Sequence, residues 1–290
     1  MYLYGCSMCY GVNAVGLDNS VEYIENRLRA KNGYRNGNLI DMVECCRMPE
    51  VYNPKLKNLN SVVASCKIIA QKANEIIRKG EVPLFIAGDH SASIGSVSAS
   101  SNNYDDLGLI WIDAHPDINT DETTITGNIH GMSVAALIGI GETKLYGILN
   151  EKANVKPKNI VMFGLRDIDP PEKIIMDKLS IKYYNYYDMV KRGIKQCLDE
   201  ARIYLGDRYI HVSIDIDSMD PKIVPGVSIP VKDGFNIEEM NYIVLYIKNE
   251  LNVIAWDIVE FNHIYDVNDV TADYVLKLIE NINSQLCWEE

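Results

Sequence analysis

LGLIWIDAHPD, at residues 107–117, is the stretch that decides the fold. Its first six residues are apolar, which is typical of a strand buried on both faces of a parallel sheet. Three side chains of metal-binding type follow at every second position, Asp113, His115 and Asp117. On extended backbone, residues at this spacing point the same way, so we expect the three side chains to converge. Oxygen and imidazole ligands without a thiolate suit a hard or borderline divalent ion such as Mn²⁺.

The composition indicates a globular chain with a strongly acidic balance. Its 290 residues suit one large α/β domain, and we expect a single domain over residues 1–290. The apolar fraction of 47% and the charged fraction of 23% are ordinary for a soluble protein with a sizeable core. A formal net charge of −12 argues against nucleic acid or an anionic membrane as the main partner, because both need a basic face. It is compatible with a cationic small-molecule substrate.

The cysteines and the N-terminus indicate the compartment. The seven cysteines have no metal-type spacing, and their odd number favours reduced, mostly buried thiols: Cys6, Cys9, Cys45, Cys46, Cys66, Cys197 and Cys287. Cys6 and Cys9 have the C-x-x-C spacing of a redox pair, but no second pair accompanies them. The N-terminus has no basic region followed by an apolar core, and no apolar run approaches the roughly 18 residues of a membrane span. We therefore expect a cytoplasmic protein.

Apolar runs alternate with helical patterns along the chain. The expected strands are residues 1–6, 38–44, 82–87, 107–112, 159–164, 181–184, 209–214 and 253–259. The expected helices are residues 21–31 and 59–79, one entered after Ser91, one from near His130, one ending near 179, and 188–205, 237–250 and 271–286. This alternation predicts an α/β fold with a mostly parallel central sheet covered on both faces.

Polar residues follow five of these strands at their carboxyl ends. They are His90, the group Asp113, His115 and Asp117, then Asp169, the pair Asp215 and Asp217, and Glu260. In open α/β sheets this edge is where ligands bind, so we expect one cleft to gather these groups.

Six of these residues form a candidate metal site: His90, Asp113, His115, Asp117, Asp215 and Asp217. Four crowded carboxylates do not all stay ionised without compensation, because like charges raise one another's pKa. Two divalent cations would balance them. A binuclear site of this kind lowers the pKa of a bridging water towards about 7 and supplies hydroxide as a nucleophile.

Three blocks of sequence resemble the signatures of the ureohydrolase superfamily of arginases, agmatinases and formimidoglutamases. They are GDHS at 88–91, DAHPD at 113–117 and SIDIDSMDP at 213–221, and arginase is the most similar branch. The resemblance implies a three-layer αβα sandwich and two Mn²⁺, with Co²⁺ or Fe²⁺ possible. It assigns one metal to His90, Asp113, Asp117 and Asp215, and the other to Asp113, His115, Asp215 and Asp217. Trimers or hexamers are common in this family, so a homo-oligomer is expected by analogy.

The same resemblance assigns the substrate residues. The arginase loop that binds the α-carboxylate corresponds to Asn119, Thr124, Thr126 and Asn128, and the α-amino group is met by Asp169 with Glu172 one turn further on. Glu260 corresponds to the acid that pairs with the guanidinium, and His130 to a proposed proton shuttle. The expected reaction is hydrolysis of L-arginine to L-ornithine and urea by attack of metal hydroxide on the guanidinium carbon. Asp117 would take or relay a proton.

Several alternatives stay open from the sequence. Asp169 and Glu172 also fit a helix cap, Thr126 and Asn128 a turn, and His130 a helix start or a hydrogen bond to substrate. Ile229 stands where arginases place a threonine near the guanidinium, with Ser228 beside it. The difference keeps other guanidino or formimino substrates open as alternatives to L-arginine, such as agmatine, guanidinobutyrate and formimidoglutamate. The third possibility is an inactive structural or regulatory subunit, against which the intact ligand set argues.

Overall fold

An eight-stranded sheet forms the centre of the computed structural model, which describes residues 1–12, 14–32, 39–149, 152 and 154–283. The strands are β1 (Tyr2–Cys6), β2 (Asp41–Met42), β3 (Pro83–Ala87), β4 (Gly108–Ile112), β5 (Ile160–Leu165), β6 (Lys182–Asn185), β7 (Tyr209–Asp215) and β8 (Asn252–Val259). Their order is β2-β1-β3-β8-β7-β4-β5-β6. Every adjacent pair is parallel. The sheet thus has the parallel character that the sequence predicts.

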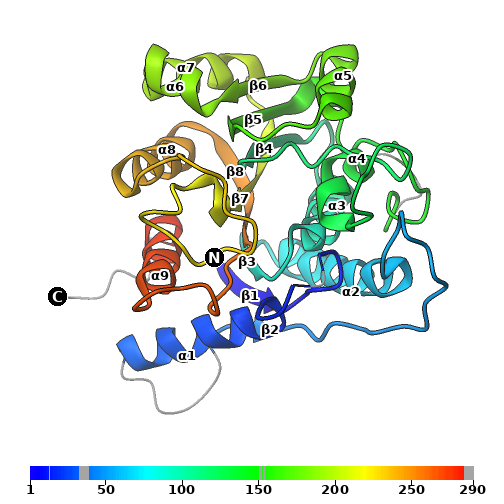
Figure 1. The fold of residues 1–290 in the computed structure, drawn as a ribbon. Helices are drawn as coiled ribbons and strands as arrows, with labels where there is room; N and C mark the ends of the chain where they lie inside the picture. Colours follow the sequence, from blue (N-terminus) through cyan, green and yellow to red (C-terminus); the bar gives the residue numbers. More distant parts are fainter. Residues whose placement is uncertain (13, 33–38, 150–151, 153, 284–290) are drawn as a thin grey trace.

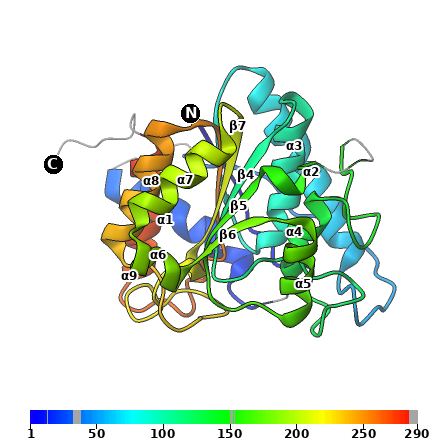
Figure 2. The same ribbon diagram turned by 90° about the horizontal axis from the view of Figure 1, so that it is seen from above.

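Helices cover both faces of this sheet, as Figures 1 and 2 show from two directions. One layer contains α1 (Ser20–Asn32), α6 (Tyr186–Arg192), α7 (Ile194–Leu205), α8 (Ile237–Glu250) and α9 (Val270–Ile282). The other contains α2 (Leu59–Arg78), α3 (Ser93–Asn103), α4 (Ser133–Leu137) and α5 (Pro170–Leu179). The predicted three-layer αβα arrangement is therefore confirmed.

The apolar run in β4 explains why this strand lies in the middle of the molecule. Ile110 and Ile112 pack in the core beneath α7, α8 and α9, whereas Leu109 and Trp111 pack in the core on the α3 and α4 side. Alternate side chains of one strand thus enter two different cores. A strand that is apolar at every position is stable only with helices on both sides.

Strand order brings distant segments of the chain to one edge of the sheet. β8 and β7 lie between β3 and β4, although they come last in the sequence. In the register of β7, Ile214 is opposite Ile112 of β4 on one side and Ile258 of β8 on the other. The residues that follow these positions, Asp113 and Asp215 among them, are therefore neighbours at the carboxyl edge.

The structure differs from the sequence prediction in a few boundaries. The predicted helix 188–205 is two helices, because Gly193 between them has φ of +93°, a left-handed conformation that glycine tolerates best. The predicted strand 38–44 is reduced to Asp41–Met42, and its first residue, 38, lies outside the described residues. The predicted end of the last helix, 284–286, also lies outside them. Within the described part of the chain, no helix is both long and apolar enough to cross a membrane.

Candidate active site

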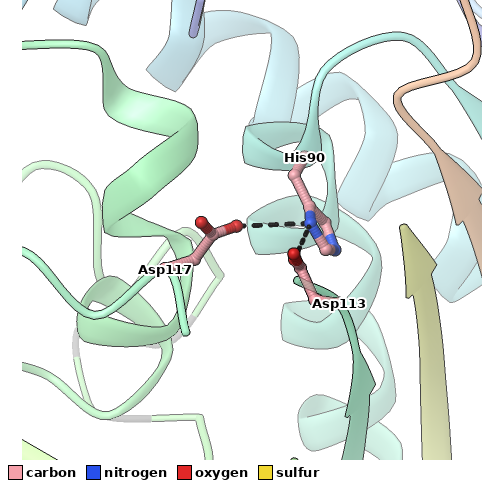
Figure 3. Close-up of side chains that lie close together, drawn as sticks. All are labelled: His90, Asp113 and Asp117. Atoms are coloured by element: carbon pink, nitrogen blue, oxygen red, sulfur yellow. Dashed lines mark ion pairs between the residues drawn. The ribbon is translucent and has the colours of Figure 1, made fainter. Parts of the chain in front are cut away.

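His90 is the centre of one half of the cluster formed by the six predicted metal ligands, which is called the ligand cluster from here on: His90, Asp113, His115, Asp117, Asp215 and Asp217. It opens the short 3₁₀ turn His90–Ala92 after β3. Its Nδ1 lies 3.0 Å from Oδ2 of Asp113, 3.2 Å from Oδ2 of Asp117 and 3.2 Å from Oδ2 of Asp215. Figure 3 shows His90, from the turn after β3, and Asp113 and Asp117, from the segment after β4, pointing toward one another. The structure therefore places three of the other predicted ligands around Nδ1 of His90.

His115 is the centre of the other half. Its Nδ1 lies 3.0 Å from Oδ2 of Asp217 and 3.4 Å from Oδ1 of Asp113. His90, Asp113 and Asp117 form one group that could hold a metal ion, and Asp113, His115 and Asp217 form a second. Asp113 belongs to both groups, so its two oxygens face two adjacent positions.

Asp113, His115 and Asp117 converge as predicted, but strand alternation is not the reason. β4 ends at Ile112, and the chain beyond it bends instead of continuing as extended strand. Oδ1 of Asp113 accepts the backbone N–H of His115 at 2.7 Å, and Asp117 has φ of +49°. Asp117 thus reaches the site through a left-handed turn and not through strand alternation.

Two residues to which no sequence motif assigns a role, Trp111 and Ser213, contact the predicted ligands and orient them. Nε1 of Trp111 donates to Oδ2 of Asp113 at 3.0 Å, and its ring is stacked on His90 with centroids 3.8 Å apart. Oγ of Ser213 lies 2.8 Å from Nε2 of His90. Such partners fix the orientation of ligands. Each of them precedes a predicted ligand by two residues, Asp113 or Asp215, and this spacing could have identified them from the sequence.

Burial and neighbouring negative charges raise the pKa of several carboxyl groups in the cluster. Burial and the charge of Asp113 raise the pKa of Asp117 to about 6. Burial together with Asp217 and Asp113 raises the pKa of Asp215 well above its usual value, and the pKa of Asp217 is raised as well. The protein alone thus disfavours the fully ionised cluster, which cations would stabilise.

The donor set fits divalent metal ions. Nδ1 of His90 and Oδ2 of Asp117 lie 3.2 Å apart, yet both are buried and make no hydrogen bond, and burying such atoms unpaired is costly. A metal ion would satisfy both. The ligand atoms are carboxylate oxygens and imidazole nitrogens, which suits Mn²⁺, Co²⁺ or Fe²⁺.

A cavity of about 170 Å³ opens above the cluster. Its described lining residues are His115, Asp117, Asn119, Thr126, His130, Gly131, Asp167, Asp169, Glu172, Asp215, Asp217, Val227, Ser228, Ile229 and Glu260. Two residues predicted to bind substrate are not among them. Thr124 is buried behind the wall, where its Oγ1 accepts the N–H of Gly127 at 2.9 Å, and half-buried Asn128 lies 3.3 Å from Nζ of Lys57.

Asp169 and Glu172 stand at the start of α5 and also face the cavity. Nδ2 of Asn119 donates to Oδ2 of Asp169 at 3.0 Å. This hydrogen bond joins the residue predicted to bind the α-carboxylate to the residue predicted to bind the α-amino group. Glu172 accepts backbone N–H groups from Asp169 and Ile118 at 3.0 and 3.1 Å. Burial raises the pKa of Glu172 to about 8. Glu172 therefore has the contacts of a helix cap as well as a place in the cavity wall.

Glu260 lies deep in the cavity, beyond the end of β8. It has φ of +64°, and its Oε1 accepts the backbone N–H of His90 at 2.9 Å. The same oxygen is 3.0 Å from Nδ1 of His130. Burial opposes a charged imidazole, but the contact with Glu260 raises the pKa of His130 to about 9. The two residues are thus in direct contact beside the ligand cluster.

The cavity wall near Glu260 is partly apolar. Val227 and Ile229 line it, and Ile229 is 39% exposed. Ser228 lines the cavity too, although an extended backbone would turn it away. Its Oγ accepts a hydrogen bond from Nδ2 of Asn262 at 2.9 Å. Asp167, another lining residue without an assigned role, has its Oδ2 3.7 Å from Nε2 of His115.

Comparison with known proteins gives one consistent result. The model of the arginase family matches residues 9–283. The arginase of Bacillus subtilis (strain 168) is 35% identical over 229 residues, which cover 79% of this chain and 77% of that protein. The crystal structure of arginase from Bacillus cereus has a TM-score of 0.87 at 31% identity, covering 97% of this chain and 96% of the other. Arginase from Entamoeba histolytica, solved with L-ornithine, has a TM-score of 0.86 at 26% identity, with coverages of 97% and 99%.

Proposed function

Because the chain belongs to the arginase family, we propose that it hydrolyses L-arginine to L-ornithine and urea. The observation that carries the proposal is the composition of the cavity. The cavity is lined by members of the ligand cluster, by Glu260, and by the hydrogen-bonded pair Asn119 and Asp169. L-arginine has a guanidinium at one end and an α-amino acid group at the other, so this arrangement offers a partner for each.

We assign two divalent ions, with Mn²⁺ as the first choice, to the ligand cluster. His90, Asp113, Asp117 and Asp215 would hold one ion, and Asp113, His115, Asp215 and Asp217 the other. When bound, the ions would balance the carboxylates and lower the pKa of a water between them.

Glu260 would bind the guanidinium, because a carboxylate matches the planar N–H donors of that group. Asp169 would accept the α-ammonium. The α-carboxylate would be held by Asn119 and Thr126, which line the cavity, while Thr124 and Asn128 shape the loop behind them. Bound in this way, the substrate has its guanidinium carbon above the ligand cluster.

Two side chains would move the protons. Hydrolysis adds water to the guanidinium carbon and breaks its bond to the side-chain nitrogen of the future ornithine. That nitrogen leaves as an amine and must gain a proton. Asp117 is placed to take a proton from the attacking water and pass it on. His130 is half-buried at the cavity wall, where it can exchange protons with solvent.

Ile229 supports a second candidate within the same reaction class. It places an apolar side chain in the cavity wall close to the proposed guanidinium subsite. Agmatine, guanidinobutyrate or formimidoglutamate would then be the substrate, with the same metal ligands. An inactive structural subunit is the least supported proposal, because all six predicted ligands lie close to one another.

The test is product release by Mn²⁺-loaded protein with L-arginine, agmatine and guanidinobutyrate side by side, and with metal-free protein as the control. Selective release of urea from L-arginine supports the proposal. Urea from agmatine or guanidinobutyrate alone would overturn the assignment of Asn119, Thr126 and Asp169. If no urea forms from any of them, formamide release from formimidoglutamate is the next measurement, and a negative result there favours the non-enzymatic proposal.

A further inference from the structure

Two cysteines that are far apart in the sequence face each other beyond the carboxyl ends of β1 and β2. Sγ of Cys6 lies 2.9 Å from Sγ of Cys45. Cys6 is the last residue of β1, and Cys45 follows β2 by three residues. Two further thiols are engaged elsewhere: Cys66 donates to the carbonyl oxygen of Ser91, and Cys46 contacts Sδ of Met48 at 3.5 Å. The C-x-x-C spacing therefore identified one member of a close pair and not its partner.

The backbone on both sides fixes this encounter. Gly5 is opposite Met42 in the parallel pair of β1 and β2, and Val43 donates its N–H to the carbonyl oxygen of Gly5 at 2.7 Å. The carbonyl oxygen of Cys6 accepts the N–H of Gly88 at 3.1 Å. A disulfide has its sulfur atoms about 2.05 Å apart, so closing the bond requires a shift of about 0.9 Å.

The segment that contains Cys45 also contacts the loop around Gly127, which is assigned to substrate binding. Residues 43–58 form the long connection between β2 and α2 that is visible in Figure 1. Near its end, Lys57 donates its backbone N–H to the carbonyl oxygen of Gly127 at 3.0 Å. A Cβ on Gly127 would lie 1.9 Å from the carbonyl oxygen of Pro54, so the two backbones are in direct contact. The position of this connection therefore helps to position the loop.

We propose that Cys6 and Cys45 are a reversible disulfide site, oxidised by exchange with a small-molecule disulfide, and that the bond pins residues 43–58 to β1. This inference does not rest on the proposed function. It also differs from the Cys6 and Cys9 pair that the spacing indicates.

The exchange consumes one molecule of the small disulfide. Cys45 is half-buried and Cys6 is fully buried, so Cys45 is the sulfur that solvent reaches first. The Cys45 thiolate attacks one sulfur of the oxidant, and one small thiol leaves. The Cys6 thiolate then attacks Sγ of Cys45 in the mixed disulfide and displaces the second small thiol. Two protein thiols lose two electrons and two protons in total, and the oxidant is reduced to two thiols.

Burial and proximity influence the rate in opposite directions. The hydrogen bond with Cys45 and burial raise the pKa of Cys6, which slows its conversion to thiolate. The mixed disulfide would form next to Cys6, however, which favours the second step. We therefore expect faster closure at pH 9 than at pH 7.

The experiment is mass spectrometry of the full chain as purified, after incubation with oxidised glutathione and alkylation of the remaining thiols. The expected product has lost two hydrogen atoms and contains one intramolecular cross-link. Trypsin leaves Cys6 and Cys9 on one peptide and Cys45 and Cys46 on another, so the variants Cys9→Ser and Cys46→Ser identify the partners. Both should keep the cross-link. Cys45→Ser should abolish it.

A chain that keeps all its thiols, or a cross-link that disappears in Cys9→Ser or Cys46→Ser, would overturn the proposal. Thermal unfolding provides the second measurement, because closing a loop between Cys6 and Cys45 should raise Tm by several degrees in the oxidised wild type. Cys45→Ser, which alters a half-buried side chain, should show no such shift. A cross-link without a change in Tm would refute the pinning of residues 43–58. Neither readout depends on urea release.

Discussion

Nδ1 of His130 lies 3.0 Å from Oε1 of Glu260, a residue 130 positions further along the chain. The same oxygen accepts the backbone N–H of His90 at 2.9 Å. One carboxylate therefore links the proposed proton carrier to the start of the ligand cluster. Its other oxygen, Oε2, is the atom we assign to the guanidinium.

Replacing His130 by asparagine should slow proton transfer more than it weakens binding. We expect kcat for L-arginine to fall about 100-fold, a typical contribution of a general acid–base group, with a much smaller change in KM. Imidazole in the buffer should restore part of the rate. His263→Asn is the matched control, because His263 is stacked on Tyr23 and does not line the cavity. An unchanged kcat in His130→Asn would remove His130 from the mechanism.

The same histidine predicts a pH dependence of stability in the metal-free protein. Its pKa is raised from 6.5 to about 9, so its contribution to stability is complete below pH 6.5 and is lost as the pH rises through 9. Over this window the free energy of unfolding should fall more steeply in wild type than in His130→Asn. The difference in slope is at most about 1.4 kcal/mol per pH unit. Denaturant unfolding of both proteins measures it, and parallel curves would contradict the prediction.

Asp215→Asn should have opposite effects with and without metal. A carboxylate whose pKa is raised by burial and by neighbouring acids costs stability at any pH above its usual value, and asparagine removes this cost. We therefore expect a higher Tm for the metal-free variant than for metal-free wild type. Mn²⁺ should then raise the Tm of wild type far more, because the variant has lost a ligand to both proposed ions. Asp121→Asn, a half-exposed position on the loop after the ligands, is the control.

Ile229→Thr tests whether the apolar wall sets the substrate. A hydroxyl at this position would offer a hydrogen bond near Glu260 worth about 0.5–1.5 kcal/mol. We expect kcat/KM for L-arginine to rise about two- to tenfold. Ile229→Val keeps an apolar side chain and should change little. If Ile229→Thr lowers kcat/KM instead, the apolar contact itself binds the substrate.

The sequence was sufficient to predict that the six side chains of the ligand cluster lie together, because each of them follows a strand that its apolar residues identify. Trp111 to Asp117 contains three of the six ligands, and parallel strands bring the others to the same edge. Contacts between residues far apart in the chain could not be predicted from the sequence. The contacts of His130 with Glu260 and of Cys6 with Cys45 depend on the insertion of β8 and β7 between β3 and β4, and on the pairing of β1 with β2. Nothing in the local pattern of either residue specifies that order.

Lys57 provides the last prediction, because the cavity is rich in carboxylates while the proposed substrate has an α-carboxylate of its own. Nζ of Lys57 is 3.3 Å from Oδ1 of Asn128, at the loop assigned to that group. Its positive charge should reduce the repulsion between the α-carboxylate and the acidic wall.

We expect Lys57→Gln to raise KM for L-arginine about two- to fivefold, the range for an exposed charge worth about 0.5–1 kcal/mol, and added salt should shrink the difference. Inhibition by 1,4-diaminobutane, which is L-ornithine without its carboxylate, should not weaken. Lys67→Gln, on the exposed side of α2, is the charge-matched control. Equal weakening of both ligands in Lys57→Gln would show that Lys57 shapes the loop and does not recognise the carboxylate.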